Sequence, residues 1–529
     1  MKKYLLFVFL FLFGLTSCTD LDEVVYDLLT EDRFYEHFTD EDMMAALGSV
    51  YSDMRRLYAG SNIHTGGSWL YTAEESADLW ITPKRGGAWY DGGLYFRLNQ
   101  HTWTPQHQHF LGNWRTFYRG VNTCNRLLFQ FEDQDFEGIE TIIAEIKVAR
   151  AFWYYHLIDF FGNVPLVTDY DVPDNFLPET SSREEVFAFM VNELEESIPN
   201  LKETGYGRWN KYAAKHLLAR VYLNSEVWSG VPHWEKVIEL SNDILDSGRY
   251  SLDIDYSTPF SINNFPNSRE LVLAIPNDEI YHPFGQAFHI HLWAHHWKYR
   301  YHANTETYFW GGFAAPPDFI DSYHSEDLRL DKTWFGGQLY DNTGELTGTV
   351  GTPLTCDPWN PRDLGKPLIY TKEIVFDDDG ITTGEGDGLR AIKYEIREGA
   401  LNSLSVDFPY FRYADVYFMK AEALWRNNNR QATQQVVDLI NEVRSRAFVD
   451  FSGDRVLSVD QLDDERFLQE YAWEFAVEGH RRQQLIRFGA FTDTEWIMKD
   501  HPSETHRVLY PIPHEEIMAN PNLTQNPGY

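Results

Sequence analysis

The spacing of apolar residues along the chain predicts helices over much of its length. Apolar positions recur every three or four residues, the period at which side chains share one face of a helix. The pattern is clearest where Trp209, Ala213, Leu217 and Val221 form one stripe. The same spacing predicts helices at 39–58, 108–131, 138–161, 183–198, 209–228, 233–247, 410–427, 430–447 and 463–488.

Two pairs of predicted helices have the form of units in a helical repeat. Residues 410–427 and 430–447 are joined by three asparagines, and residues 209–228 and 233–247 have a similar pattern. Their lengths, and the alanines at packing positions, are similar to a tetratricopeptide repeat, although the full consensus is absent. We therefore expect a mainly α fold built on a tetratricopeptide-like scaffold.

The helical period fails between about residues 250 and 405. This stretch is rich in Gly, Pro, Asn and aromatic residues, and it contains short β-like runs such as Leu271–Ile275. A loop region of this length inside a compact protein is either functional or misassigned. We expect an irregular subregion with short strands, packed on the helices, and a similar loop at 62–107.

The N-terminus has the features of an export signal. Lys2 and Lys3 precede an apolar run from Tyr4 to Leu15, which is too short to span a bilayer as a mature helix. The run ends in LTSC at Cys18, which resembles the lipobox of bacterial lipoproteins. The resemblance implies cleavage before Cys18 and acylation of that residue, and several acyl chains would anchor the protein stably. An ordinary secretory peptide with a chance cysteine is the alternative.

These observations divide the chain into a signal peptide (1–17), a lipidated acidic tether (18–38) and one domain (39–529). Two cysteines remain beyond the lipidation site, Cys124 and Cys356. They could pair in an oxidising compartment, but a core of this size needs no disulfide, so we favour two free, buried thiols.

Composition narrows the choice of partners. The 529 residues include 45 Lys plus Arg and 80 Asp plus Glu, a formal charge of −35. Such an acidic balance argues against a nucleic-acid partner, because phosphate backbones recruit Lys and Arg. Aromatic residues reach 16%, with 17 Trp, which is more than a core obviously needs.

The C-terminal half carries a distinctive order of motifs. The chain ends in RVLYPIPHEEIMANPNLTQNPGY from residue 507, preceded by RYADV at 412–416, the run E-x3-E-x3-EG-x-R at 470–481 and LIRFG at 485–489. FGNVPL stands at 161–166. In order and spacing these motifs resemble the SusD/RagB family of outer-membrane lipoproteins. One departure is that Arg482 and Gln484 stand where the family usually has Trp and Asp.

The resemblance implies a function as well as a fold. Family members are non-enzymatic, glycan-binding lipoproteins on the surface of Bacteroidetes-type bacteria, and they sit as a lid on a SusC-type TonB-dependent transporter. Their fold is helical, with four tetratricopeptide-like pairs and an irregular region that carries the ligand site. For this chain the resemblance implies helical repeats at about 39–61, 108–247 and 410–490, and a ligand-binding subregion at about 250–405. It also implies a lipid-anchored protein that faces the cell exterior and binds oligosaccharide or polysaccharide.

The C-terminal motifs themselves favour structural roles. Glu470, Glu474 and Glu478 recur at helical spacing, with Arg481 within reach on the same face, so we expect an ion-paired network rather than catalysis. Two prolines predict an extended turn before a short helix at 514–519. We expect the last five residues, QNPGY, to hydrogen-bond back to the body of the protein.

Two loop segments concentrate the residues that suit a sugar, whose rings have apolar faces and polar edges. They are 79–90 and 289–310. The candidate stacking residues are Trp80, Trp89, Tyr90, Trp293, Trp297 and Trp310, with Trp334 and Trp359 in reserve. Neighbouring cations could pair with uronic acid carboxylates or be solvated surface charges. They are Lys84, Arg85, Lys298 and Arg300.

Metal and enzyme chemistry find weak support. His289, His291, His295 and His296 crowd the second segment and could form a zinc pair, but no further ligand motif accompanies them. The DDDG sequence at 377–380 matches part of a calcium loop, and Gly386 stands at its twelfth position, so a turn is preferred and bound calcium stays open. No nucleophile elbow, P-loop or dinucleotide fingerprint is present. We assign no metal, no cofactor and no catalytic residue, and the alternatives are a glycoside hydrolase or a transporter lid that binds peptides.

Overall fold

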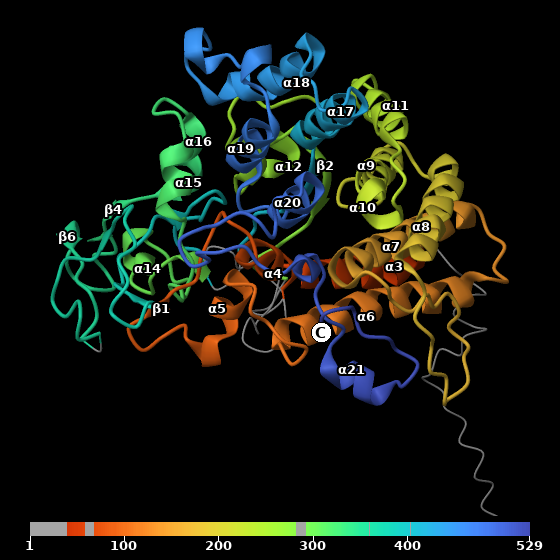
Figure 1. Cartoon of the computed structure of the whole chain (residues 1–529), viewed down its shortest axis with the longest axis horizontal. Helices are drawn as coiled ribbons and strands as arrows, with labels where there is room; N and C mark the ends of the chain where they lie inside the picture. The colour runs from red at the N-terminus through yellow and green to blue at the C-terminus, as the bar shows by residue number, and fades with distance from the viewer. Residues whose placement is uncertain (1–39, 59–67, 282–292, 359, 402–403) are drawn as a thin grey trace, which may run out of the picture. The chain divides into compact units, whose positions relative to one another are not determined.

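Long helices occupy both ends of the described chain and an irregular region lies between them in sequence (Figure 1). The structure is a computed structural model that describes residues 40–58, 68–281, 293–358, 360–401 and 404–529. Residues from Leu47 onward form one compact unit, and the segment up to Ala46 is grouped apart from it. The signal peptide, the tether with Cys18, His289, His291 and Trp359 lie outside the described residues.

The N-terminal helices follow the predicted pattern closely. Helix α6 packs on α7, α7 on α8, and α9 on α11. Gly120 permits the close approach of α6 and α7, because a Cβ there would lie 2.1 Å from the Trp153 ring. The helices are α3 (Asp40–Met54), α4 (Trp69–Glu75), α5 (Leu94–Asn99), α6 (Gln108–Phe131), α7 (Ile139–Phe161), α8 (Arg183–Ser197), α9 (Lys211–Leu223), α10 (Ser225–Ser229) and α11 (Trp234–Leu245).

The C-terminal helices continue this packing, since α11 contacts α17 and α17 contacts α18. They are α17 (Tyr413–Asn427), α18 (Gln434–Arg444), α19 (Asp464–Phe475), α20 (Arg481–Phe488) and α21 (His514–Ala519). Two predicted helices are divided: 209–228 forms α9 and α10, and 463–488 forms α19 and α20, because Val477 and Gly479 take positive φ of 68° and 83°. Residue 479 needs glycine, since a Cβ there would lie 2.4 Å from the Trp69 ring.

Between these helices the chain forms short elements. The described residues contain only two-stranded sheets. The predicted strand at 271–275 is confirmed as β2 (Leu271–Ile275), which pairs antiparallel with β10 (Phe408–Arg412). The two-residue strands are β1 (Lys84–Arg85), parallel to β8 (Thr382–Thr383), and the antiparallel pairs β3 (Trp334–Phe335) with β9 (Arg390–Ala391), β4 (Gly337–Gln338) with β7 (Ile369–Tyr370), and β5 (Tyr340–Asp341) with β6 (Thr352–Pro353).

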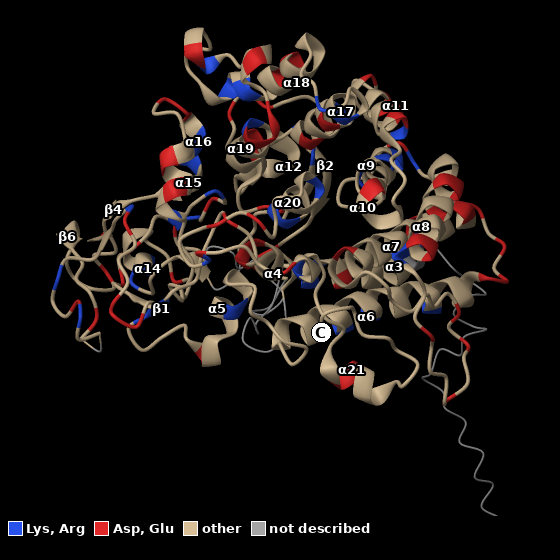
Figure 2. Cartoon of the chain, viewed as in Figure 1, with Lys and Arg blue, Asp and Glu red and all other residues tan. Residues whose placement is uncertain are grey.

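Short helical turns complete the described elements. The remaining α-helices are α12 (Asn264–Asn267), α14 (Tyr299–His302), α15 (Pro317–Ser322) and α16 (Leu328–Thr333). The 3₁₀ turns are Arg55–Leu57, Asp91–Gly93, Ile198–Asn200, Thr258–Phe260, Ser445–Ala447, Gly453–Arg455, Val459–Gln461 and Thr505–Val508. The acidic excess recurs along several elements, among them α8, α15, α19 and α21 (Figure 2).

The C-terminal segment folds back as predicted. Asn526 Nδ2 donates to the carbonyl oxygens of Phe161 and Tyr510, both at 2.8 Å. Arg482, the departure from the family motif, is buried and pairs with Asp159 at 2.9 Å, so its charge is compensated. Cys124 and Cys356 are free and buried, which confirms the favoured interpretation, and burial raises the pKa of the Cys356 thiol to about 12.

A buried ionic network joins α19 to the irregular region. Arg412, at the end of β10, pairs with Glu474 of α19 at 3.0 Å and with Glu478 at 2.8 Å. Glu478 also pairs with Lys393 at 2.6 Å, and Glu270 pairs with Arg412 at 3.1 Å. Two of the three expected glutamates, Glu474 and Glu478, therefore share an ion-paired network with cations from β10 and the segment after β9. Glu470 pairs separately with Arg444 at 2.8 Å.

The rest of this network balances its charge. Glu474 also pairs with Arg446 (2.6 Å) and Arg329 (3.5 Å), and Arg329 pairs with Asp327 (2.7 Å). Burial alone would raise the pKa of Glu474, but the three guanidinium groups around it lower the pKa to about 2. Arg481 does not take part, because α19 ends at Phe475 and Arg481 lies beyond the turn that follows. It pairs instead with Asp78 at 2.6 Å. Four carboxylates thus meet four cations: Glu270, Asp327, Glu474 and Glu478 against Arg329, Lys393, Arg412 and Arg446.

Replacing Arg412 should destabilise the whole compact unit. Arg412→Met leaves Glu474 and Glu478 buried with one cation fewer, and breaking a buried pair in this way costs about 3–5 kcal/mol. Urea denaturation followed by Trp fluorescence measures the change in the free energy of unfolding. The matched control is Arg430→Met, which breaks the exposed Arg430–Asp464 pair (2.8 Å) and should cost about 1 kcal/mol or less. Equal losses in the two variants would contradict a central role for the network.

Candidate functional site

The two loop segments predicted to carry the ligand site lie against each other. Ile81 forms an antiparallel bridge with Ala314, and Arg85 Nε donates to the carbonyl oxygen of Gly312 at 2.8 Å. Trp89 Nε1 donates to the carbonyl oxygen of Trp310 at 2.7 Å. Residues 81–90 and 310–314 therefore form one surface, although some 220 residues separate them in the chain.

Local backbone geometry places Trp89 against the second segment. Trp89 has a φ of +65°, a left-handed conformation that non-glycine residues rarely adopt. Its ring covers Gly312, where a Cβ would lie 2.7 Å from the ring, so only glycine permits this approach. Strain of this kind persists where the surrounding contacts hold it, and it is frequent in binding loops. The absence of a side chain at Gly312 thus makes room for the Trp89 indole.

Three of the predicted stacking residues are buried, including Trp89 at 9% exposed. Trp80 and Trp293 are both 0% exposed. Trp80 stacks on Phe313 with ring centroids 3.9 Å apart, and Trp293 meets Tyr71 edge-on at 5.2 Å. With both ring faces covered, neither can present a surface to a sugar, and the expectation for these two is wrong in the described structure. The reserve residue Trp334 is likewise buried.

The exposed aromatic surface has different members. Tyr90 is 46% exposed, and Lys84 Nζ lies 5.9 Å from its ring centroid. From Thr307 to Trp310 buried and exposed side chains alternate: Tyr308 is 51% exposed and Trp310 is partly exposed, whereas Thr307 and Phe309 are buried. We call Tyr90, Tyr308 and Trp310 the aromatic shelf. Sequence reasoning missed Tyr308, because in three successive aromatic residues, Tyr308, Phe309 and Trp310, no pattern separates exposed rings from buried ones.

The four predicted polar contacts differ in their surroundings. Arg85 is buried and donates to the carbonyl oxygens of Gly312, Gly384 and Asp387, so it ties loops together and cannot also reach a ligand. Lys84 is partly exposed beside Tyr90 and pairs with Asp379 at 3.5 Å. Arg300 lies over the Tyr301 ring. Lys298 pairs with Asp357 at 2.9 Å. Lys84 is therefore the polar candidate next to the shelf.

Asp379 settles the interpretation of the DDDG sequence. Its carboxylate accepts from the backbone N–H of Ile381 and Thr382 and from the Thr382 hydroxyl, and these bonds hold the pKa of Asp379 below its usual range. The Asp379 carboxylate thus closes a turn, as the turn interpretation expected.

Trp297 belongs to a buried polar cluster. Its Nε1 donates to Asp357 Oδ2 at 2.5 Å, and the same carboxylate lies 3.1 Å from His296 Nε2. Glu385 Oε2 lies 3.2 Å from that nitrogen. Burial would raise the pKa of Asp357, but hydrogen bonds from His296, Lys298 and Trp297 hold it below its usual value. The cluster fixes the indole of Trp297 by its polar edge.

His296, Asp357 and Glu385 could together hold a metal ion, since one ligand atom from each lies within 4.8 Å of the others. The tautomer of His296 argues against this use. Its Nδ1 accepts from the backbone N–H of Lys298 at 3.2 Å, so the proton sits on Nε2 and is donated to the carboxylates. An ion on Nε2 would move that proton to Nδ1, where it would face another N–H. We therefore assign hydrogen bonding, not metal binding, to the cluster.

His295 is also unsuited to the zinc pair considered from sequence. It is fully buried, stacks on Tyr299 with centroids 3.7 Å apart, and directs Nε2 at the carbonyl oxygen of Ala391. The other two histidines of that segment lie outside the described residues.

Helix α4 supports the first loop through two buried carboxyl groups. Glu75 accepts from the backbone N–H and hydroxyl of Thr82, and Glu74 accepts from the backbone N–H of Gly479. Burial raises the pKa of each to about 8. Both groups are therefore protonated in the fold at neutral pH.

Comparison with known proteins gives the same assignment from both halves of the chain. The sequence profile described as "SusD family" matches residues 399–529, and the profile described as "Starch-binding associating with outer membrane" matches residues 75–223. The starch-binding protein SusD of Bacteroides thetaiotaomicron is 25% identical over 84% of this chain and 82% of its own. The chain belongs to the SusD/RagB family.

Solved structures share the SusD-like fold. A laminarin-binding SusD-like protein superposes with a TM-score of 0.71 at 22% identity, over 93% of this chain and all of that one. Surface glycan-binding protein A from Bacteroides thetaiotaomicron, in complex with laminarihexaose, gives a TM-score of 0.70 at 17% identity, over 92% and 100% of the two chains. The expected mainly helical fold is confirmed, and the SusD family is one of non-catalytic binding proteins. Among the described residues no helix has the length and apolarity to cross a bilayer.

The stability of this SusD-like fold should fall as pH rises above about 5, through Glu74 and Glu75. An unfolded Glu titrates near pH 4.3, so between that value and about 8 the folded state binds more protons than the unfolded state. Each carboxyl should then contribute a decline of about 1.4 kcal/mol per pH unit. We expect the double variant Glu74→Gln, Glu75→Gln to lose this decline, measured by urea denaturation at pH 5, 6.5 and 8.

The control for that experiment is Glu515→Gln, on the exposed face of α21, which should keep the wild-type pH profile. Other groups titrate in the same range, so the decisive quantity is the difference between wild type and variant. A difference that stays constant from pH 5 to 8 would show that both carboxyl groups are ionised in the fold.

Proposed function

We propose that this SusD-like chain is a surface lipoprotein that captures oligosaccharide or polysaccharide and delivers it to a SusC-type TonB-dependent transporter in the outer membrane. The single observation that carries the proposal is the aromatic shelf, formed where residues 81–90 meet residues 308–314. The names of the relatives, which include starch-binding and laminarin-binding proteins, support a glycan as the ligand.

The shelf suits a sugar for physical reasons. The phenol and indole planes of Tyr90, Tyr308 and Trp310 offer apolar faces to the C–H face of a pyranose ring. Lys84 beside Tyr90 and the tyrosine hydroxyls offer polar groups to its edges. Because Trp89 fixes the two segments against each other, the shelf is formed before the ligand arrives, and little ordering is needed on binding.

A glycoside hydrolase remains the alternative that the carboxylates could favour. Hydrolysis needs two carboxyl groups placed on either side of a glycosidic bond. Asp357 and Glu385 form a buried pair in the irregular region, and both lie within hydrogen-bonding distance of His296. Asp357 is also bound by Trp297 and Lys298, so the pair is arranged around His296 and Trp297 and not on either side of a glycosidic bond. A lid that binds peptides is the second alternative, and peptide binding without any glycan binding would favour it.

Removing shelf rings should weaken glycan binding without unfolding the protein. We expect Tyr90→Ala and Trp310→Ala each to raise the Kd for a glycan about two- to tenfold, since an aromatic contact contributes about 0.5–1.5 kcal/mol. A glycan array identifies the ligand, and calorimetry then measures the Kd. Tyr170→Ala, which removes a ring of similar exposure from a loop outside the shelf, should leave the Kd unchanged.

Buried indoles must not be used for this test. Trp293→Ala would empty a core site and cost about 3–5 kcal/mol of stability, so lost binding would reflect unfolding. If Tyr90→Ala and Trp310→Ala both bind glycan as the wild type does, the shelf is not the site.

The membrane anchor rests on Cys18, and its test is independent of the ligand. Replacing Cys18 with Ala should prevent acylation, because the thiol is the group that would carry the lipid. Cells labelled with a fatty acid should then show label on the wild type alone, and the variant should leave the outer-membrane fraction. Membrane retention of an unlabelled Cys18→Ala protein would point to an ordinary secretory signal and another mode of attachment.

A further inference from the structure

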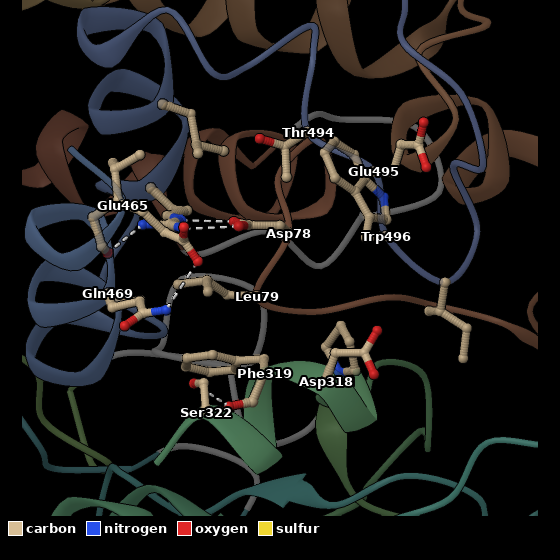
Figure 3. A pocket seen from close by; sticks show the side chains of 16 residues that line it. Asp78, Leu79, Asp318, Phe319, Ser322, Glu465, Gln469, Thr494, Glu495 and Trp496 are labelled. Atoms are coloured by element: carbon tan, nitrogen blue, oxygen red, sulfur yellow. Dashed lines mark hydrogen bonds and ion pairs between the residues drawn. The ribbon is translucent and has the colours of Figure 1, made fainter. Parts of the chain in front are cut away.

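A separate pocket of about 250 Å³ opens where the C-terminal end of α4 meets α15, α19 and the loop after α20 (Figure 3). Its apolar lining includes Leu79, Leu468 and Leu485, and its polar lining includes Gln469 and Thr494. Pockets for drug-sized ligands measure about 300–1,000 Å³, so this one has room for a single sugar ring or one side chain. None of the shelf residues lines it.

Two aromatic rings line the pocket together. Phe319 of α15 and Trp496 of the loop are 8% and 7% exposed, and both contribute to the lining (Figure 3). Trp496 is held by a hydrogen bond from Nε1 to Asn99 Oδ1 at 3.0 Å and by Lys499, whose Nζ lies 4.5 Å from the ring centroid. The rings are therefore fixed walls, suited to the apolar face of a small ligand.

The charge of the pocket is strongly negative. Its one guanidinium, Arg481, is fully used, since it pairs with Asp78 through two contacts of 2.6 and 2.7 Å and donates to the carbonyl oxygen of Leu468 at 2.7 Å. Asp318, Glu465 and Glu495 also line the pocket and are exposed at its rim. No Lys, Arg or His among the described residues forms an ion pair with any of these three. The pocket thus presents three carboxylates around two rings, and Lys499 lies close enough to Glu495 to offset part of that charge.

We infer that this pocket binds one cationic sugar residue, an amino sugar whose amine is protonated. The ring walls would take the C–H face of the sugar, and Gln469 and Thr494 would meet its hydroxyls. The ammonium group would face the three carboxylates, and it would also be attracted to the indole face. Uronic and sulfated sugars are excluded by the same charge. The inference goes beyond the proposed function, because the shelf carries no such charge selection.

The test measures how the full-length protein binds three monosaccharides that have a similar shape but different charges. Methyl glucosaminide, methyl glucoside and methyl glucuronide differ in charge by one step each, and ligand-observed NMR titration measures each Kd. We expect the glucosaminide to bind about fivefold more tightly than the glucoside, because a charge pair near 4 Å in water contributes about 1 kcal/mol. The glucuronide should not bind.

The variant Asp318→Asn, Glu465→Gln, Glu495→Gln should abolish the preference for the amine, since it removes the rim charge and leaves the walls intact. The matched control, Asp171→Asn, Asp174→Asn, Glu179→Gln, removes the same charge from an exposed loop and should keep the preference. Raising the salt concentration to 1 M should reduce the preference in wild type without any substitution.

Three outcomes would overturn the inference. Equal Kd values for the glucosaminide and the glucoside would show that charge plays no role. A preference that survives the rim variant would place the amine elsewhere. Binding of N-acetyl-lysine methylamide without binding of the glucosaminide would assign the pocket to a basic peptide segment. Tyr90→Ala should leave all three titrations unchanged, so failure of the shelf proposal and failure of this one are distinguishable.

Discussion

This structure depends most on the balance of buried charges around Arg412. Glu474 and Glu478 lie in and just after α19, and their cations come from β10, from the segment after β9 and from α16. A buried carboxylate without its cation is costly, so these elements can only be buried together. A region with two-residue strands has few backbone hydrogen bonds between strands. The ionic network therefore stabilises this region in the way that larger hydrogen-bonded sheets stabilise other folds.

The same end of α19 also positions the loops that carry the candidate ligand surfaces. The chain turns sharply after Phe475, so that Gly479 fits under Trp69 and its N–H reaches Glu74. Glu75, the next residue of α4, then holds Thr82 at the start of the first shelf segment. A path of direct contacts therefore leads from the ionic network through α4 to the shelf. Arg481, beyond the turn, meets Asp78 at the wall of the acidic pocket.

Sequence reasoning succeeded where one period governs the local structure. Residues 108–131 form α6 within the predicted bounds, because its apolar face follows the helical period without interruption. It failed at 463–488, where the helical pattern continues through Val477 and Gly479. There the contact with Trp69 and the hydrogen bond from the Gly479 N–H to Glu74 stabilise a turn. No pattern within the segment reveals a partner some 400 residues away. The segments of the candidate site were predicted, and two of its exposed rings, Tyr90 and Trp310, were among the candidates. Tyr308 was missed, and Trp80 and Trp293 were expected at the surface but are buried.

The high content of aromatic residues has a structural explanation, and for that reason it does not by itself indicate the ligand. An irregular region cannot build its core from the regular rows of a large sheet, so flat rings fill the gaps between loops, as Trp80 does on Phe313 and Trp89 on Gly312. Trp297 and Trp496 are fixed further by hydrogen bonds from their indole N–H groups to Asp357 and Asn99. Tryptophans in these loops therefore mainly fill the core, whereas the exposed tyrosines are available to contact a ligand. For this reason the partly exposed rings at 90, 308 and 310, and not the most numerous ones, should determine which ligand the shelf accepts.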